Sequence, residues 1–342
     1  MSNKKPVLIV LGEPNSVFAE ILAKTLNKTS IKNKIKFPII IIGSQNLIYK
    51  QLKVINKKLS FKILDKKNKS YNKLKNTIYL IDIKYKFKKP FEPISNRSNQ
   101  YISKCFKKAF TFLNSGQSNI IINGPISKKH FLNKKYPGVT EFIFDKSKKK
   151  ISKSPVMLIF NKELSVSPIT THIPIKYVNK RIKEKIIFNN ISIIDKFYKK
   201  TFNIKPKIAI LGLNPHCETT SKVSEENKII IPTIKKLKKK RINVEGPYSA
   251  DTFFIEKNIK KFDSVVGMYH DQVLTPFKTL FNFDASNITL GLPFLRASVD
   301  HGPNTSMLGK NKSNTQSLEN IFSFISKIKW FLLQKNHLGK IF

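Results

Sequence analysis

Three histidines of this chain share one sequence context. His172 follows a strand-like run and two threonines, His216 follows a run ending in Asn-Pro, and His270 follows a run ending in Met-Tyr. Because open α/β sheets place ligands at the carboxyl ends of their strands, the three imidazoles are expected to converge on one cation. Three neutral nitrogen ligands suit zinc or cobalt and leave coordination positions open for a substrate. The spacing matches no compact metal motif, and hydrogen-bonded histidines at strand ends are the alternative, but the shared context favours a metal.

Cationic and amide side chains accompany the last of these histidines, in a stretch rich in glycine and proline at residues 263–310. Lys278 and Arg296, with Asn287 between them, suit a phosphate or a carboxylate. Arg296 is one of only four arginines, whereas lysine is so abundant that a single lysine carries less weight. Asp251 is expected either to cap a helix or to place a carboxylate at the mouth of the site.

The remaining histidines and the glycines give weaker indications of function. We expect His301 to cap a turn or support a neighbour, and His130 and His337 to lie in polar surface contexts. No GxGxxG fingerprint follows any predicted strand, so a dinucleotide would bind in another arrangement.

Short apolar runs alternate with amphipathic segments along most of the chain. Strands are predicted at residues 6–11, 37–42, 78–83, 119–122, 155–160, 164–171, 207–213, 265–268 and 287–290. Helices are predicted at residues 17–26, 47–55, 99–113, 178–198 and 317–333, and residues 129–153 are expected to be irregular except around 137–142. This alternation predicts an α/β architecture rich in βαβ units.

Length and composition are typical of a soluble globular protein. The 342 residues suffice for two modest domains or one large one, and 40% are hydrophobic. The two cysteines, Cys105 and Cys217, are too few for a disulfide framework, which favours a reducing compartment. No apolar run is long enough for a signal peptide or a membrane span, so we expect a cytoplasmic protein without a membrane partner.

The formal net charge of +43 suggests nucleic-acid binding as an alternative function. However, the charge comes almost entirely from lysines spread along the chain, whereas nucleic-acid binders concentrate charge on one face and use arginine. We therefore expect no specific nucleic-acid partner, although the charge should attract phosphorylated small molecules.

Eight motifs, distributed over nearly the whole chain, resemble those of 4-hydroxythreonine-4-phosphate dehydrogenases of vitamin B6 biosynthesis. In chain order they read GEPN, NGPISK, PGVTEF, TTHIPI, LGLNPHCE, GPYSADT, MYHDQ and NITLGLPFLRASVDHG. The resemblance implies a two-domain fold similar to isocitrate and isopropylmalate dehydrogenases, with a cleft between the domains. We place the first domain at residues 1–135 plus 305–342 and the second at residues 136–304. The resemblance also implies a homodimer with its site at the interface.

The same resemblance implies roles for individual residues. His172, His216 and His270 would bind one divalent ion per site, which would be zinc, magnesium or cobalt. Thr140, Lys278, Asn287 and Arg296 would hold the phosphorylated substrate. The reaction would be NAD- or NADP-dependent oxidation of 4-phosphooxy-L-threonine at C3, followed by decarboxylation to 3-amino-2-oxopropyl phosphate. Lys278 and Asp251 are the candidates for proton transfer, and the cofactor-binding residues are not predicted.

The chain departs from the family pattern at three places. Val139 stands where the family commonly has histidine, the segment after GEP lacks the usual glycines, and Cys217-Glu218-Thr219-Thr220 replaces small and glycine residues after His216. The predicted metal ligands are all present, while the predicted substrate-binding residues are partly altered. An alternative is therefore a sister dehydrogenase acting on 4-phospho-D-threonate or 4-phospho-D-erythronate.

Overall fold

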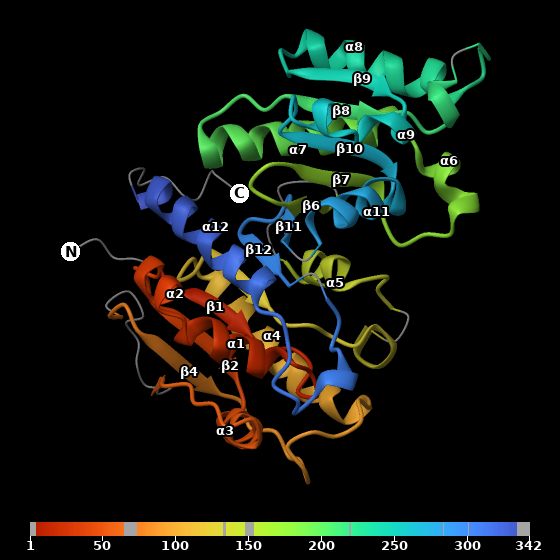
Figure 1. Ribbon diagram of the computed structural model, residues 1–342. Coiled ribbons are helices and arrows are strands. Elements are labelled where there is room, and N and C mark those ends of the chain that lie inside the picture. Colours follow the sequence, from red (N-terminus) through yellow and green to blue (C-terminus); the bar gives the residue numbers. More distant parts are fainter. Residues whose placement is uncertain are drawn as a thin grey trace. The chain divides into compact units, whose positions relative to one another are not determined.

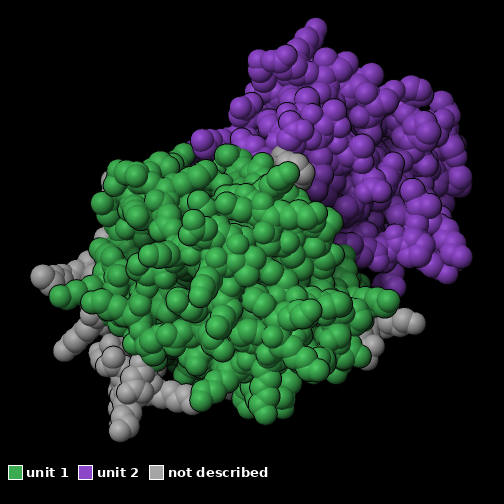
Figure 2. All heavy atoms as spheres, turned by 60° about the horizontal axis from the view of Figure 1, so that its bottom comes forward, with its two compact units in different colours: residues 1–151, 292–342 green, residues 152–291 purple. Residues whose placement is uncertain are grey.

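The structure, a computed structural model, describes residues 5–64, 74–132, 135–147, 154–218, 220–282, 284–299 and 301–333, with only the backbone described at 329–333. The chain divides into two compact units, residues 1–151 with 292–342 and residues 152–291 (Figure 2). Each unit is built from strands and helices, so the predicted two-domain α/β class is confirmed.

The first unit contains parallel strands in the order β3-β4-β2-β1-β5-β12, of which β4, β2, β1 and β12 are labelled in Figure 1. Their bounds are β1 Val7–Val10, β2 Ile39–Gly43, β3 Lys62–Ile63, β4 Ile78–Asp82, β5 Ile120–Asn123 and β12 Leu295–Ser298. Strands β1, β2 and β5 are continuous buried runs of isoleucine, valine and leucine, as expected for parallel strands covered on both faces.

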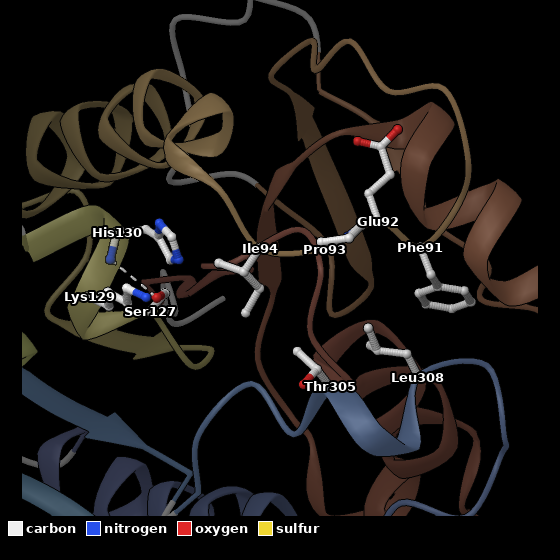
Figure 3. A pocket seen from close by; sticks show the side chains of 9 residues that line it. All are labelled: Phe91, Glu92, Pro93, Ile94, Ser127, Lys129, His130, Thr305 and Leu308. Carbon is white, nitrogen blue, oxygen red and sulfur yellow. Dashed lines mark hydrogen bonds between the residues drawn. The ribbon is translucent and has the colours of Figure 1, made fainter.

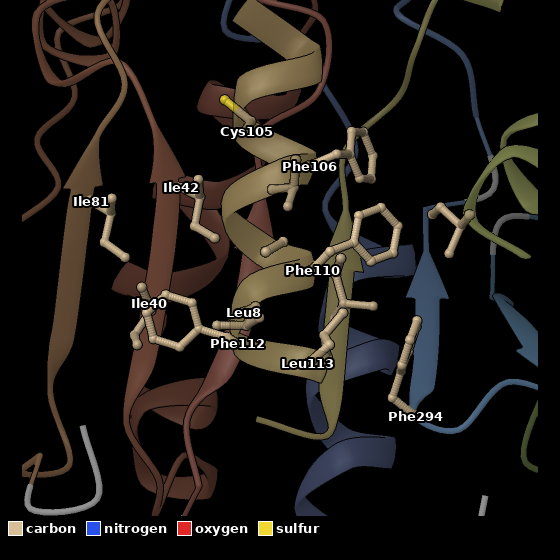
Figure 4. Close-up of a cluster of buried hydrophobic side chains, with 14 of the residues drawn as sticks. Leu8, Ile40, Ile42, Ile81, Cys105, Phe106, Phe110, Phe112, Leu113 and Phe294 are labelled. Carbon is tan, nitrogen blue, oxygen red and sulfur yellow. The ribbon is translucent and has the colours of Figure 1, made fainter. Parts of the chain in front are cut away.

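Helices cover both faces of this sheet. They are α1 Phe18–Asn27, α2 Thr29–Lys34, α3 Gln45–Val54, α4 Asn99–Asn114, α5 Val139–Lys146 and α12 Gln316–Leu333. Figure 4 shows α4 lying across the sheet, with Phe106, Phe110 and Leu113 in the cluster that includes Leu8 and Ile40. Alternate residues of β1 point to the opposite face. Helix α12 packs against β12, α1 and α2.

The second unit has strands in the order β11-β6-β7-β10-β8-β9. Their bounds are β6 Val156–Phe160, β7 Ser165–Thr170, β8 Ile208–Leu211, β9 Val244–Tyr248, β10 Ser264–Tyr269 and β11 Ser286–Leu290. β6 is antiparallel to both β11 and β7, whereas β7, β10, β8 and β9 run parallel. The carboxyl ends of β7, β10 and β8 therefore lie next to one another.

Helices of the second unit are α6 Val178–Arg181, α7 Glu184–Phe202, α8 Ile231–Lys239, α9 Ala250–Phe253, α10 Glu256–Ile259 and α11 His270–Phe281. Helix α11 packs on β7 and β10, and its Val273, Leu274 and Phe277 join the unit's buried cluster with Phe253. Helix α7 packs on β7, β11 and α8. Among the described residues, no helix is long and apolar enough to cross a membrane.

The structure corrects several sequence-based expectations. Helix α5 extends through residues 143–146, which were expected to be irregular, and the helix predicted at 178–198 is interrupted at Ile182 and Lys183. Strands β9 and β12 and helix α8 were not predicted. Residues 136–151 and 292–304, assigned to the second domain from sequence, group largely with the first unit because β12 pairs with β5 and α5 packs into that unit's core.

Candidate active site

The three histidines singled out from sequence all follow parallel strands of the second unit. His172 lies just beyond β7, His216 lies just beyond β8, and His270 is the first residue of α11 after β10. Because β10 lies between β7 and β8, the three histidines are at the same edge of the sheet. Each histidine therefore follows the end of a strand, as predicted from sequence.

His172 and His270 lie close together. Their ring centroids are 5.7 Å apart, and Nδ1 of His270 is 2.6 Å from Oδ1 of Asp271. Zinc holds imidazole nitrogens about 2.0 Å away, which sets two ligand rings roughly 5 to 6 Å apart. A carboxylate on the other ring nitrogen is the usual support for a metal-bound histidine. The separation and the donor chemistry of this pair thus fit one divalent ion.

His216 has a different partner. Its Nδ1 lies 3.6 Å from Oδ2 of Asp251, and its side chain is 83% exposed. Asp251 is inside α9 and Ser249 occupies the N-cap position, so the helix-cap role considered for Asp251 is wrong. The Ser249 hydroxyl donates to Asp251, and this bond, with the nearby His216, lowers the pKa of the Asp251 carboxyl. The carboxylate therefore stays charged in mildly acidic solution.

The three imidazoles do not form one ligand group in this structure. Within the described ranges, no set of three or more His, Cys, Asp or Glu side chains is arranged to hold a metal ion. The side chains instead make one histidine pair and one His216–Asp251 contact. A three-histidine metal centre therefore stays a prediction.

Arg296 and Thr140, predicted to hold the substrate, contact each other in the first unit. Arg296 Nη1 donates to Thr140 Oγ1 at 2.9 Å, and Nε donates to Asn123 Oδ1 at 2.9 Å. β12 places the arginine, β5 ends at the asparagine, and α5 places the threonine in its first turn. Asn123 belongs to the NGPISK motif, whose side chains the sequence analysis did not assign to the site.

The Arg296 guanidinium is buried, with 2% of the residue exposed. Burial lowers its pKa to about 10, while the neighbouring Glu141 carboxylate acts in the opposite direction. At neutral pH the group remains a buried cation, and its attraction for an anion is weakly screened there. No side chain caps the N-terminus of α5, so its backbone N–H groups add to the positive potential there.

Lys278 and Asn287 belong to the second unit. Lys278 is exposed on α11, and Asn287 is a half-buried residue of β11. The Oδ1 atom of Asn287 is buried without a hydrogen-bond partner among the described residues, and such an atom is a natural acceptor for a ligand group.

A pocket of about 480 Å³ opens in the first unit, among loops that follow β4, β5 and β12 (Figure 3). Its lining residues are Phe91, Glu92, Pro93, Ile94, Ser127, Lys129, His130, Thr305 and Leu308. Figure 3 shows Ile94, Thr305 and Leu308 on neighbouring walls, with Lys129 and His130 at one end. His130 was expected in a polar surface context, and the tertiary structure places it in the lining of this pocket.

The wall at residues 91–94 is anchored to the GEPN loop. Asn15 Oδ1 accepts the Glu92 N–H at 2.9 Å, and Gln51 Nε2 donates to the carbonyls of Pro14 and Pro90 at 2.7 and 2.9 Å. Asn15 lies in the segment after GEP, where the chain departs from the family's usual pattern. Its side-chain amide supplies this contact.

A family model described as pyridoxal phosphate biosynthetic protein PdxA matches residues 34–324 of the chain. The chain belongs to this family. A relative from Sulfurihydrogenibium sp., named 4-hydroxythreonine-4-phosphate dehydrogenase, is 37% identical over 90% of this chain and 94% of its own. This result confirms the family inferred from the motifs.

Two further comparisons give a solved structure and a relative named for a different substrate. A crystal structure of 4-hydroxythreonine-4-phosphate dehydrogenase from Klebsiella pneumoniae matches with a TM-score of 0.76 and 26% identity, covering 98% of this chain and 100% of the other. A relative from Salmonella typhimurium, 28% identical over 92% of this chain and 96% of its own, is named D-threonate 4-phosphate dehydrogenase. The relatives are named as dehydrogenases, which makes the family one of oxidoreductases.

Proposed function

We propose that the protein is a metal-dependent dehydrogenase that uses NAD or NADP to oxidise 4-phosphooxy-L-threonine at C3. The product would lose CO2 to give 3-amino-2-oxopropyl phosphate, in the synthesis of pyridoxine 5′-phosphate. The observation that carries this proposal is the 37% identity to a relative named 4-hydroxythreonine-4-phosphate dehydrogenase along nearly its full length. The enzyme would act in the cytoplasm as a homodimer.

Residues of the first unit would hold the anionic part of the substrate. Arg296, oriented by Asn123 and Thr140, offers a cation whose geometry is set before the ligand arrives. A guanidinium pairs with phosphate or carboxylate through parallel N–H bonds, and pre-ordering reduces the entropy lost on binding. Asn287 and Lys278 of the second unit would complete the substrate contacts.

Residues of the second unit would act at the reacting carbon. His172, His216 and His270 would hold a divalent ion, which when bound lowers the pKa of the C3 hydroxyl while nicotinamide accepts the hydride. Asp251 and Lys278 are the candidates for proton transfer. The lowered pKa of Asp251 suits a carboxylate that stays charged beside His216 and orients its ring.

The pocket of the first unit would take part of the cofactor. A volume of about 480 Å³ accommodates a nucleoside, and Phe91, Pro93, Ile94 and Leu308 give it apolar walls for a base. Lys129 supplies positive charge for a phosphate group.

A second candidate substrate is favoured by Val139. This side chain packs against the first unit's core beside Thr140, where the family commonly has a histidine that offers a polar contact. A relative named D-threonate 4-phosphate dehydrogenase supports this candidate. A sugar-acid phosphate, 4-phospho-D-threonate or 4-phospho-D-erythronate, is therefore the alternative.

The deciding experiment follows NADH or NADPH formation by absorbance with each of the three phosphorylated acids, with zinc, magnesium or cobalt added. We expect turnover of 4-phosphooxy-L-threonine, and we expect a chelator to abolish it. His216→Ala should lower kcat at least about 100-fold, as removal of a group acting in the transition state does. Its melting temperature should fall by no more than about 4 °C, because the side chain is exposed and the expected cost is that of alanine at a left-handed backbone position.

Lys222→Ala is the matched control, since Lys222 is an exposed residue of the same loop. It should leave kcat unchanged. Turnover of a sugar-acid phosphate alone would move the protein to the alternative substrate. Absence of turnover with all three acids, or full activity in the presence of chelator, would refute the proposed reaction.

A further inference from the structure

The loop that carries His216 has an unusual backbone. His216 and Cys217 both adopt positive φ values, 54° and 56°, although neither is glycine. Residues other than glycine disfavour positive φ values, so two of them in succession keep this conformation only where surrounding contacts hold them. The His216 side chain is itself exposed, so these contacts must act on the neighbouring backbone.

Glu226 provides such contacts. It is 0% exposed, and its Oε1 accepts the N–H groups of Leu213 and Asn214 at 2.7 and 2.9 Å. Its Oε2 accepts from Asn214 Nδ2 at 2.7 Å. Removing a carboxylate from water is costly unless hydrogen bonds replace the lost solvation, and here three donors from one short segment do so. The carboxylate thus fixes the residues just before His216.

Gln272 connects the same loop to the segment that carries His270. Its Nε2 donates to the Gly212 carbonyl at 2.7 Å, and its Oε1 accepts the Met268 N–H at 2.6 Å. At Gly212, an added Cβ would lie 2.7 Å from Cys217 Sγ and 3.0 Å from Glu226 Oε1. The two histidine-bearing segments are therefore joined through one buried set of polar contacts around Gly212.

We propose that Glu226 is a positioning residue for His216, with Gln272 linking the His216 loop to the start of α11. This inference rests on the proposed metal-dependent reaction, in which the imidazole must be presented in one orientation. Glu226 acts through the backbone N–H groups of Leu213 and Asn214, which precede His216. A supporting residue of this kind changes metal affinity or activity by about 10- to 100-fold when removed.

The test compares Glu226→Ala with Glu226→Gln. The alanine variant should lower kcat about 10- to 100-fold with a KM within about twofold of wild type, and should weaken zinc binding, measured by calorimetry with zinc chloride alone, by a similar factor. Amide hydrogen exchange at Leu213 and Asn214 should accelerate in the metal-free protein. The glutamine variant keeps an oxygen that accepts both N–H groups, so it should restore most of the zinc affinity and kcat.

Glu20→Ala is the matched control, because Glu20 is also buried and its Oε1 accepts the Ser313 N–H at 2.8 Å, but in the first unit. It should lower the melting temperature without changing zinc affinity or kcat. The positioning role would be overturned if Glu20→Ala and Glu226→Ala lowered zinc affinity and kcat equally, or if Glu226→Gln restored neither. It would also be overturned if the wild-type protein did not bind zinc. The protein could be inactive on all three acids while zinc binding and amide exchange change as expected in the Glu226 variants. That outcome would refute only the proposed substrate.

Discussion

Glu13 is a buried carboxyl group in the GEPN loop, with 2% of the residue exposed. Burial raises its pKa above the ordinary value of 4.5, and hydrogen bonds from the Asn15 N–H at 3.2 Å and the Ser98 hydroxyl at 3.1 Å oppose this only in part. The folded protein therefore binds the proton of Glu13 more tightly than the unfolded chain does.

We predict that Glu13→Gln changes the pH dependence of stability. As pH rises from 4.5 to the raised pKa, the unfolded chain releases the Glu13 proton first, so this residue's contribution to the free energy of unfolding falls. Glutamine keeps an acceptor for Asn15 and can donate to Ser98, but it does not titrate. Urea unfolding at a series of pH values should therefore show a variant that gains stability relative to wild type as pH rises from about 4 to about 7.

A variant that loses stability relative to wild type over the same range would show that Glu13 is stabilised as an anion. Glu92→Gln is a control of opposite sign, because N–H groups of Lys88 and Lys89 lower the pKa of Glu92. Stability due to the Glu92 carboxylate is present above its ordinary pKa and lost as pH falls through the lowered pKa. That variant should therefore lose stability at neutral pH.

At the level of elements, helix α7 ends at a residue whose side chain favours a left-handed backbone. The helix runs from Glu184 to Phe202 and ends at Asn203, whose φ of 58° and ψ of 32° are left-handed. Asparagine tolerates this conformation better than residues other than glycine, and the left-handed cap directs the chain toward β8. The predicted start at residue 178 missed the interruption before α7, because Ile182 and Lys183 continue the apolar and basic pattern.

Asn203→Ala should destabilise the protein by about 1 kcal/mol, the cost of placing a Cβ-bearing residue without a compensating amide in the left-handed region. Asn203→Gly should be neutral or slightly stabilising, since glycine adopts this conformation without strain. Chemical unfolding of both variants measures the difference. Lys205→Ala, at an exposed site of the same connection, is the control and should be nearly neutral. Equal stabilities for the alanine and glycine variants would contradict the strain argument.

At the level of the whole molecule, charge is the dominant feature. The chain has 64 lysines and arginines against 21 aspartates and glutamates. Most lysines therefore lack an acidic partner, and their mutual repulsion favours the expanded, unfolded chain. Salt shortens the range of this repulsion to about 10 Å at 0.1 M.

We predict that sodium chloride stabilises the protein at neutral pH, raising its melting temperature by a few degrees between about 10 mM and about 150 mM. An uncharged osmolyte at equal osmolarity is the control and should act more weakly over this range. Inorganic phosphate should give a larger increase than chloride at equal ionic strength if Arg296 binds anions. A melting temperature that falls with salt would show that attractive ion pairs outweigh the repulsion.

The sequence by itself determined the family, the α/β class and most strands, because buried parallel strands need continuous apolar runs such as residues 39–42 and 120–122. It also placed His172, His216 and His270 at strand exits, which follows from local patterns. Tertiary structure alone decided that β12 pairs with β5, that Arg296 reaches Asn123 and Thr140, and that His130 lines a pocket. It likewise decided that Glu226 and Gln272 hold the His216 loop. Such contacts join residues far apart in the chain, and one sequence carries no local signal for the pairing of distant polar groups.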